Sequence, residues 1–236
     1  MKPARLFATL SAKGYGTYRP LRNRCVAALI AASAFFLPAM AAAETRLLAL
    51  GDSLTQGYGL PADQGFVPRL QAWLRDQGRD VRVINAGVSG DTTAGGRARV
   101  EWALADEPDA MIVALGGNDL LRGIDPASSR ENLSAILDAA ASRDLPVLLV
   151  GLVAPGNYGP EFQQAFEAMY PDLAAEYEVM HYPNMLQPMM EKADAGESFV
   201  DLMQDDHIHP SARGIDLIVE AMGPTVLELL DRAEEG

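Results

Sequence analysis

Residues 110–119 read Ala-Met-Ile-Val-Ala-Leu-Gly-Gly-Asn-Asp, six apolar residues followed at once by two glycines, an asparagine and an aspartate. An unbroken apolar run of this length is typical of a strand that is buried on both faces, as in a parallel sheet. The glycine pair ends the strand, so polar side chains stand directly at its carboxyl end. These ten residues predict a parallel α/β fold with polar chemistry at one edge of the sheet.

Similar apolar runs recur along the chain, and helical periodicity fills the intervals between them. The expected strands are 46–50, 81–84, 110–115 and 147–150, with a weaker fifth at 179–182. The expected helices are 67–76, 126–142, 162–177 and 212–230, and Pro171 is expected to kink or restart the third of them. This alternation predicts a three-layer α/β/α domain, in which helices cover both faces of a five-stranded parallel sheet.

The residues that follow each strand are the first functional candidates, because ligands of open α/β sheets bind beyond the carboxyl ends of the strands. Ser53 follows the first expected strand, Gly90 lies just beyond the second, and Asn118 follows the third. Taken singly, each has an ordinary explanation, since serines cap helices and glycines and asparagines form turns. Their occurrence together at one sheet edge is what favours a site.

A histidine pair near the C-terminus supplies the candidate base, in the sequence Asp206-His207-Ile208-His209. An acid three residues before a histidine can reach its Nδ1 and leave Nε2 free to act as a base toward a serine. This spacing selects Asp206 with His209, and His207 remains an alternative base or a contact at the rim of the site. A metal site of Asp206, His207, His209 and His181 is the other alternative, although we expect no metal.

The charge of the chain argues against one class of partner. The chain has 236 residues and a net charge of −13, but residues 1–43 hold six basic and no acidic residues. Residues 44–236 therefore carry a net charge of −19, which repels nucleic acid, so we expect no nucleic-acid partner. The single cysteine, Cys25, excludes an internal disulfide and a cysteine-based zinc or redox site.

Residues 1–43 are predicted to be a cleaved secretory signal peptide. A basic start is followed by nineteen uncharged residues, 25–43, that end in Ala41-Ala42-Ala43. A basic region, a short apolar region and a small-residue end describe such a signal. The alternative is an uncleaved membrane anchor, for which nineteen residues are marginally long. We expect a protein of residues 44–236 that is periplasmic or secreted and has no stable membrane span after cleavage.

Together these motifs resemble the SGNH hydrolases, also called the GDSL family. The family has a serine in a Gly-Asp-Ser block, a glycine, an asparagine in a Gly-x-Asn-Asp block and a histidine in an Asp-x-x-His block. In this sequence they match Ser53, Gly90, Asn118 and His209, in the family's order, with Asp206 as the acid. The stretches 50–59, 83–92, 115–123, 154–158 and 203–210 look most like the secreted bacterial acyl-CoA thioesterase, lysophospholipase and arylesterase group. The resemblance spans nearly all of residues 44–236.

The resemblance implies a flavodoxin-like SGNH fold and a serine esterase that acts on small-molecule esters and thioesters. Ser53 would be the nucleophile, His209 its base and Asp206 the residue that orients the base. The oxyanion hole would consist of the backbone N–H groups of Ser53 and Gly90 and the side chain of Asn118. The implied enzyme needs no cofactor, and we expect a monomer.

Two other functions are compatible with the same sheet. One is a carbohydrate O-deacetylase, because the wider family includes such enzymes. The other is a flavodoxin-like binding protein without catalysis, which would share the sheet and the glycines at the strand ends. The binding protein leaves unexplained why Ser53, Asn118 and the Asp206–His209 pair occur together.

Overall fold

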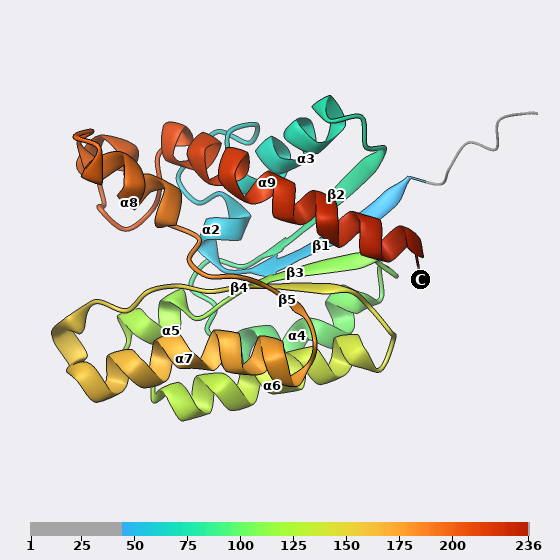
Figure 1. The fold of residues 1–236 in the computed structure, drawn as a ribbon, viewed down its shortest axis with the longest axis horizontal. Coiled ribbons are helices and arrows are strands. Elements are labelled where there is room, and N and C mark those ends of the chain that lie inside the picture. Colours follow the sequence, from blue (N-terminus) through green and yellow to red (C-terminus); the bar gives the residue numbers. More distant parts are fainter. Residues whose placement is uncertain (1–43, 236) are drawn as a thin grey trace, which may run out of the picture. The chain divides into compact units, whose positions relative to one another are not determined.

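The structure is a computed structural model that describes residues 44–235 (Figure 1). Residues 1–43, which hold the expected signal peptide, lie outside the described residues. Five strands form one sheet, in the order β2-β1-β3-β4-β5, and all neighbours are parallel. The strands are β1 (Thr45–Gly51), β2 (Val81–Gly87), β3 (Ala110–Ala114), β4 (Val147–Val150) and β5 (Met180–Tyr182). All five expected strands are thereby confirmed, including the weaker fifth.

Helices and short turns connect the strands. In chain order they are α2 (Ser53–Gln56), α3 (Phe66–Asp76), α4 (Thr93–Leu104), α5 (Gly117–Leu121), α6 (Pro126–Ala141), the 3-10 turn η1 (Gly156–Tyr158), α7 (Pro160–Glu176), α8 (Gln187–Asp194), the 3-10 turn η2 (Phe199–Leu202) and α9 (Ala212–Glu235). Among the described residues, no helix is long and apolar enough to span a bilayer.

The sheet separates two apolar cores, which explains the unbroken apolar runs of its strands. In β1, Leu47 and Ala49 pack into the core beneath α3 and α9, whereas Leu48 and Leu50 pack into the core shared with α4, α6 and α7. Figure 1 shows these two helical layers on opposite faces of the sheet. Both faces of each central strand are buried, so hydrophobic burial selects a continuous run and not an alternating pattern.

Pro171 was expected to kink or restart its helix, and the restart is wrong. Helix α7 is one element from Pro160 to Glu176 and passes through Pro171. Pro171 lies on the exposed face, whereas Phe166, Tyr170 and Leu173 are buried around it. Burial of this apolar face on both sides of the proline outweighs the one helical hydrogen bond that a proline lacks.

The order of the strands places the edge where a ligand is expected. From β1 the chain moves to the sheet edge at β2 and then returns across β1 to β3. The connections therefore reverse direction between β1 and β3, which is the switch point where open α/β sheets bind ligands. Ser53 follows β1 and Asn118 follows β3, so the two side chains flank this switch point.

Candidate active site

Ser53 is the first residue of α2, in a tight turn at the end of β1. Asp52 caps this turn, because its Oδ1 accepts a hydrogen bond of 3.0 Å from the backbone N–H of Leu54. The turn packs against the end of β2, where a Cβ on Gly87 would lie 2.3 Å from the backbone nitrogen of Gln56. Glycine is therefore required at position 87 for the turn to approach the sheet so closely.

Ser53, His209 and Asp206 form a hydrogen-bonded chain. The Nε2 of His209 lies 2.8 Å from the Ser53 Oγ, and its Nδ1 lies 2.6 Å from the Asp206 Oδ2. The Asp206 Oδ1 accepts the backbone N–H groups of Ile208 and His209, each at 3.0 Å. The hydrogen bonds from the His209 ring and from these two N–H groups lower the pKa of Asp206 to about 2. Asp206 is therefore ionised at neutral pH and available to orient the imidazole.

Two neighbouring side chains hold His209 in place. The Tyr58 ring packs on the imidazole, with ring centroids 4.8 Å apart. The Gln204 Nε2 donates to the backbone carbonyls of Tyr58 and Pro210, at 2.9 and 3.0 Å. These contacts tie the segment after α2 to the loop that carries His209. His207, the alternative base, is exposed, has a positive φ of 56°, and in the described part of the chain no hydrogen bond joins it to Ser53.

A cavity of about 130 Å³ opens beside Ser53 and His209. Most of its other lining side chains are apolar, namely Leu54, Leu120, Leu121, Leu152, Val153, Leu186 and Ile208. Asp52, Gly117 and Asn118 complete the lining. Ser53 and His209 thus border a small, mostly apolar cavity, which suits the acyl or aryl part of an ester.

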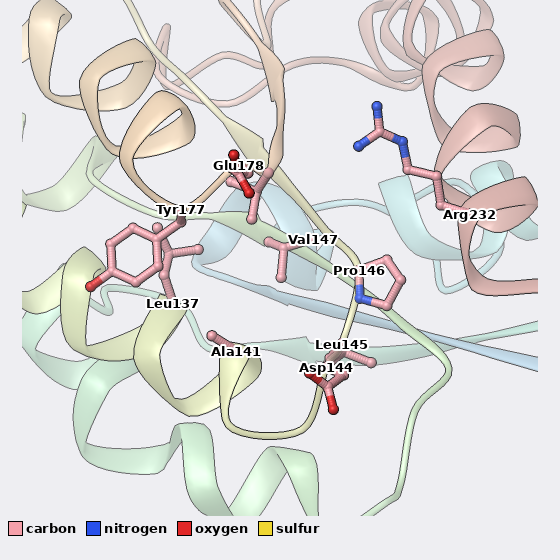
Figure 2. A pocket seen from close by; sticks show the side chains of 10 residues that line it. Leu137, Ala141, Asp144, Leu145, Pro146, Val147, Tyr177, Glu178 and Arg232 are labelled. Atoms are coloured by element: carbon pink, nitrogen blue, oxygen red, sulfur yellow. The ribbon is translucent and has the colours of Figure 1, made fainter. Parts of the chain in front are cut away.

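A larger cavity of about 330 Å³ lies elsewhere, around the amino ends of β4 and β5 (Figure 2). Asp144, Glu178 and Arg232 are its charged lining residues, and no serine or histidine lines it. Asp144 and Glu178 have positive φ angles where α6 and α7 end, as residues at helix C-termini commonly do. This cavity lacks the serine and histidine pair that lines the smaller one, so we place the chemistry at the smaller cavity.

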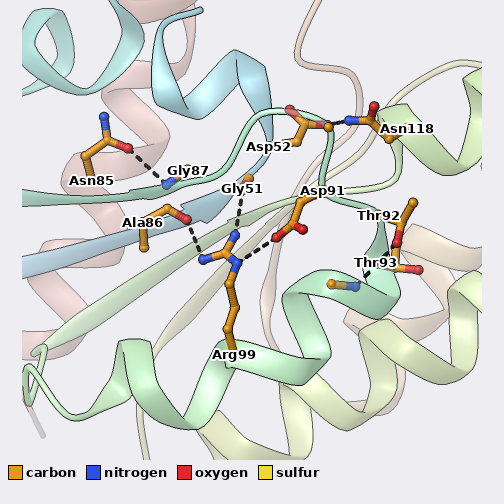
Figure 3. Close-up of polar contacts among 12 residues, drawn as sticks. Gly51, Asp52, Asn85, Ala86, Gly87, Asp91, Thr92, Thr93, Arg99 and Asn118 are labelled. Atoms are coloured by element: carbon orange, nitrogen blue, oxygen red, sulfur yellow. Dashed lines mark hydrogen bonds and ion pairs between the residues drawn. The ribbon is translucent and has the colours of Figure 1, made fainter.

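Asn118 and Gly90 lie on opposite sides of the switch point. Asn118 is the second residue of α5, and its Nδ2 donates to the Asp52 Oδ2 at 3.2 Å (Figure 3). Gly90 lies in the loop between β2 and α4 with a φ of 81°, and its carbonyl accepts from the Arg122 guanidinium at 2.8 Å. Among the described residues, no hydrogen bond joins Gly90 to Ser53 or Asn118.

Arg99 fastens the loop that carries Gly90 to the ends of two strands. Its guanidinium donates to the Asp91 carboxylate at 2.6 Å and to the carbonyls of Ala86 and Gly51 at 2.8 Å each (Figure 3). The planar fork of arginine suits several fixed acceptors at once. Arg99 was not among the residues expected from the sequence, where its only signal is a basic residue shortly after Gly90.

A buried network fixes the start of α5. The Asp119 carboxylate accepts hydrogen bonds from the backbone N–H and hydroxyl of Thr93, at 2.8 and 2.6 Å, and from the Ser129 hydroxyl at 2.9 Å. These bonds connect α5 to α4 and α6, the helices that carry Thr93 and Ser129. The Asp119 carboxylate, which follows Asn118 directly in the chain, therefore fixes the position of Asn118.

The remaining histidine lies apart from this constellation. His181 is on β5, and burial lowers its pKa, so its neutral form is favoured. Within residues 44–235, no group of three or more His, Cys, Asp or Glu side chains is arranged to hold a metal ion.

Comparisons with known proteins agree on one family. Residues 49–217 match the model of the GDSL-like Lipase/Acylhydrolase family. The chain is similar to "Esterase TesA" of Pseudomonas aeruginosa, with 40% identity over 195 residues that cover 82% of this chain and 93% of the relative. It is 35% identical to "Thioesterase 1/protease 1/lysophospholipase L1" of Escherichia coli K12 over 193 residues, 81% of this chain and 88% of that one. Among solved structures, AlinE4, described as an SGNH-hydrolase family esterase, matches with a TM-score of 0.64 and 43% identity, and the match covers 80% of this chain and 98% of the other.

Proposed function

The chain belongs to the GDSL-like lipase/acylhydrolase family, and from this premise we propose that it is a serine esterase that cleaves carboxylic esters and thioesters through an acyl-enzyme on Ser53. One observation carries the proposal: the Ser53 Oγ lies 2.8 Å from the His209 Nε2, while the Nδ1 of the same ring lies 2.6 Å from Asp206. A nucleophile, a base and a group that orients the base are thereby in hydrogen-bond reach of one another.

The reaction follows from these contacts. His209 Nε2 takes the proton of the Ser53 hydroxyl as the oxygen attacks the substrate carbonyl, and Asp206 stabilises the imidazolium that forms. His209 then gives this proton to the departing alcohol or thiol, which leaves an acyl group on Ser53. A water molecule, deprotonated by the same ring, hydrolyses the acyl-enzyme and restores the serine. No step in this sequence uses a cofactor.

We propose that the negative oxygen of each tetrahedral intermediate is bound by the backbone N–H groups of Ser53 and Gly90 and by the Asn118 amide. Donors placed where charge develops stabilise the transition state more than the substrate. The position of Asn118 in the lining of the Ser53 cavity supports its part in this hole.

The apolar lining favours an ester with an apolar acyl or aryl group over an acetylated sugar. Recognition of a glycan would call for polar groups around Ser53. The cavity is instead lined mainly by apolar side chains, which come from α2, α5, the segment after β4 and the positions of Leu186 and Ile208. The two hydrolase hypotheses are distinguished by kcat/KM, measured on p-nitrophenyl acyl esters, acyl thioesters and acetylated glycans. Faster turnover of the glycans would favour the deacetylase.

Labelling with a fluorophosphonate tests the proposal directly, because such probes modify an activated serine. Mass spectrometry of the labelled protein is expected to locate one adduct, on Ser53. The matched control is the exposed Ser89, whose hydroxyl bonds to Gln56 and which should remain unmodified. The absence of an adduct on the folded protein would refute the nucleophile and favour the binding-protein reading.

We further propose that residues 1–43 are removed as a secretory signal, and that residues 44–236 act as a periplasmic or secreted monomer. The basic start and the uncharged stretch of residues 25–43 support this. The intact mass of protein recovered from each cell fraction tests the cleavage near Ala43, and light scattering tests the oligomeric state. Full-length protein in the membrane fraction would support the anchor instead.

A further inference from the structure

Asp52 is a buried carboxyl group to which the mechanism above assigns no role. Only 2% of its surface is exposed, and it lies between the nucleophile and Asn118. Its Oδ1 accepts from the backbone N–H of Leu54 at 3.0 Å, and its Oδ2 accepts from the Asn118 Nδ2 at 3.2 Å (Figure 3). The first contact caps α2, which an uncharged serine or asparagine does equally well. A helix cap therefore does not explain why a charged group is buried here.

We propose that Asp52 is a positioning residue that fixes which end of the Asn118 amide faces the oxyanion. The proposal rests on the proposed function, in which Asn118 donates to that oxyanion. An ionised carboxylate only accepts hydrogen bonds, so it pairs with the NH₂ end of an amide and repels the carbonyl end. One Nδ2 hydrogen then binds Asp52, and the other remains for the substrate oxygen.

Asp52 is the residue whose contact can orient the Asn118 amide. Among the described residues, the bond to Asp52 is the one hydrogen bond that the Asn118 side chain makes. An amide turned by half a rotation would direct Oδ1 at both the Asp52 Oδ2 and the substrate oxygen, and three acceptors would then face one another. Gly117 leaves room for the carboxylate, since a Cβ there would lie 3.1 Å from the Asp52 Oδ2.

The charged groups near Asp52 act on it in opposite directions. Burial raises the pKa of Asp52 to about 6, and the negative charge of Asp119 adds to this rise. The N–H of Leu54, the Asn118 amide and the electrostatic effect of His209 lower the pKa. Asp52 is thus ionised and purely an acceptor above about pH 6, the form that the orienting role needs.

The test is the variant Asp52→Asn, which keeps the shape of the side chain and an acceptor for Leu54. Its amide can present either end to Asn118, so the preference for one orientation is lost. We expect kcat to fall at least tenfold, toward the roughly 10²–10³-fold that loss of one oxyanion donor costs, while KM stays unchanged. The matched control is Asp125→Asn, because the exposed Asp125 caps α6 through the N–H of Ala127 in the same way and should show wild-type kcat.

A double-mutant cycle separates positioning from a merely structural role. If Asp52 acts through Asn118, adding Asp52→Asn to Asn118→Ala should change kcat less than twofold. An equal loss in both backgrounds, or wild-type kcat for Asp52→Asn, would overturn the proposal. If Asp52→Asn does not fold, Asp52→Ser caps α2 through its hydroxyl and takes its place in the cycle.

The cycle also distinguishes failure of this inference from failure of the proposed function. If kcat falls more than 100-fold in Asn118→Ala but is unchanged in Asp52→Asn, the role of Asn118 as an oxyanion donor is supported and its positioning by Asp52 is refuted. If Asn118→Ala itself keeps wild-type kcat, the proposed oxyanion hole fails and this inference fails with it. Labelling of Ser53 in each variant shows whether the nucleophile remains activated.

Discussion

Asparagine in place of Asp52 should make the protein more stable at neutral pH, although it lowers turnover. Burial is the largest cause that raises the pKa of Asp52 from 3.8 to about 6. A shift of about two units corresponds to roughly 3 kcal/mol of free energy that the folded state loses when this buried group ionises. Asparagine has the same shape and no charge, so the variant avoids this loss.

The direction of the pKa shift determines the pH range in which the variant gains stability. Because the pKa of Asp52 is higher in the folded than in the unfolded protein, its contribution to stability is complete below pH 3.8 and is lost as the pH rises through about 6. The free energy of unfolding of the variant should therefore exceed that of the wild type by roughly 1–2 kcal/mol at pH 5 and by roughly 3 kcal/mol at pH 8. At pH 8 this raises Tm by roughly 6–12 °C.

Urea unfolding at pH 5 and pH 8 measures the difference between variant and wild type. Asp206, whose pKa is lowered, is present in both proteins, so its own pH dependence cancels. Asp125→Asn, at an exposed helix cap, should remain within about 0.5 kcal/mol of the wild type at both pH values. The reasoning would be refuted if the difference in unfolding free energy between variant and wild type were no larger at pH 8 than at pH 5. It would also be refuted if the variant were less stable than the wild type at pH 8.

Three further changes test other contacts. Tyr170→Phe removes the buried hydroxyl that donates to the Leu115 carbonyl at 3.0 Å and should cost about 1–3 kcal/mol in urea unfolding; an unchanged midpoint would contradict this. Asp206→Asn should lower kcat by about 10⁴ with the fold intact, as circular dichroism would show, and a loss below tenfold would remove Asp206 from the mechanism. Arg99→Lys loses the fork that binds two carbonyls and should cost about 2–4 kcal/mol, whereas Arg97→Lys, in an exposed ion pair, should cost less than about 1 kcal/mol.

The sheet could be predicted from the sequence because its strands are buried on both faces. Runs such as residues 110–115 have no other simple explanation, and the structure confirms each expected strand. Helix α4 could not be predicted in this way, since it contains Gly95 and Gly96 and lacks a clear apolar stripe. A Cβ on Gly96 would lie 2.3 Å from the Leu115 side chain, so tertiary packing requires the glycine that local propensity disfavours.

The candidate site was partly predictable for a related reason. Ser53 and Asn118 follow neighbouring parallel strands, so the sheet alone brings them to one edge, and the spacing of Asp206 and His209 indicated their pairing. The supporting residues were not predictable. Arg99 binds acceptors 8, 13 and 48 residues away, and the burial of Asp52 follows only from the packed fold.

Two carboxyl groups flank Ser53, and their environments move their pKa values apart. Asp206 is partly exposed and accepts hydrogen bonds from three N–H groups, which lower its pKa to about 2, whereas burial raises that of Asp52 to about 6. More solvent around Asp52 would stabilise its charge, but water would then compete for the Asn118 N–H that it holds. The burial that destabilises the folded protein is therefore the same burial that lets one carboxylate determine how Asn118 is oriented.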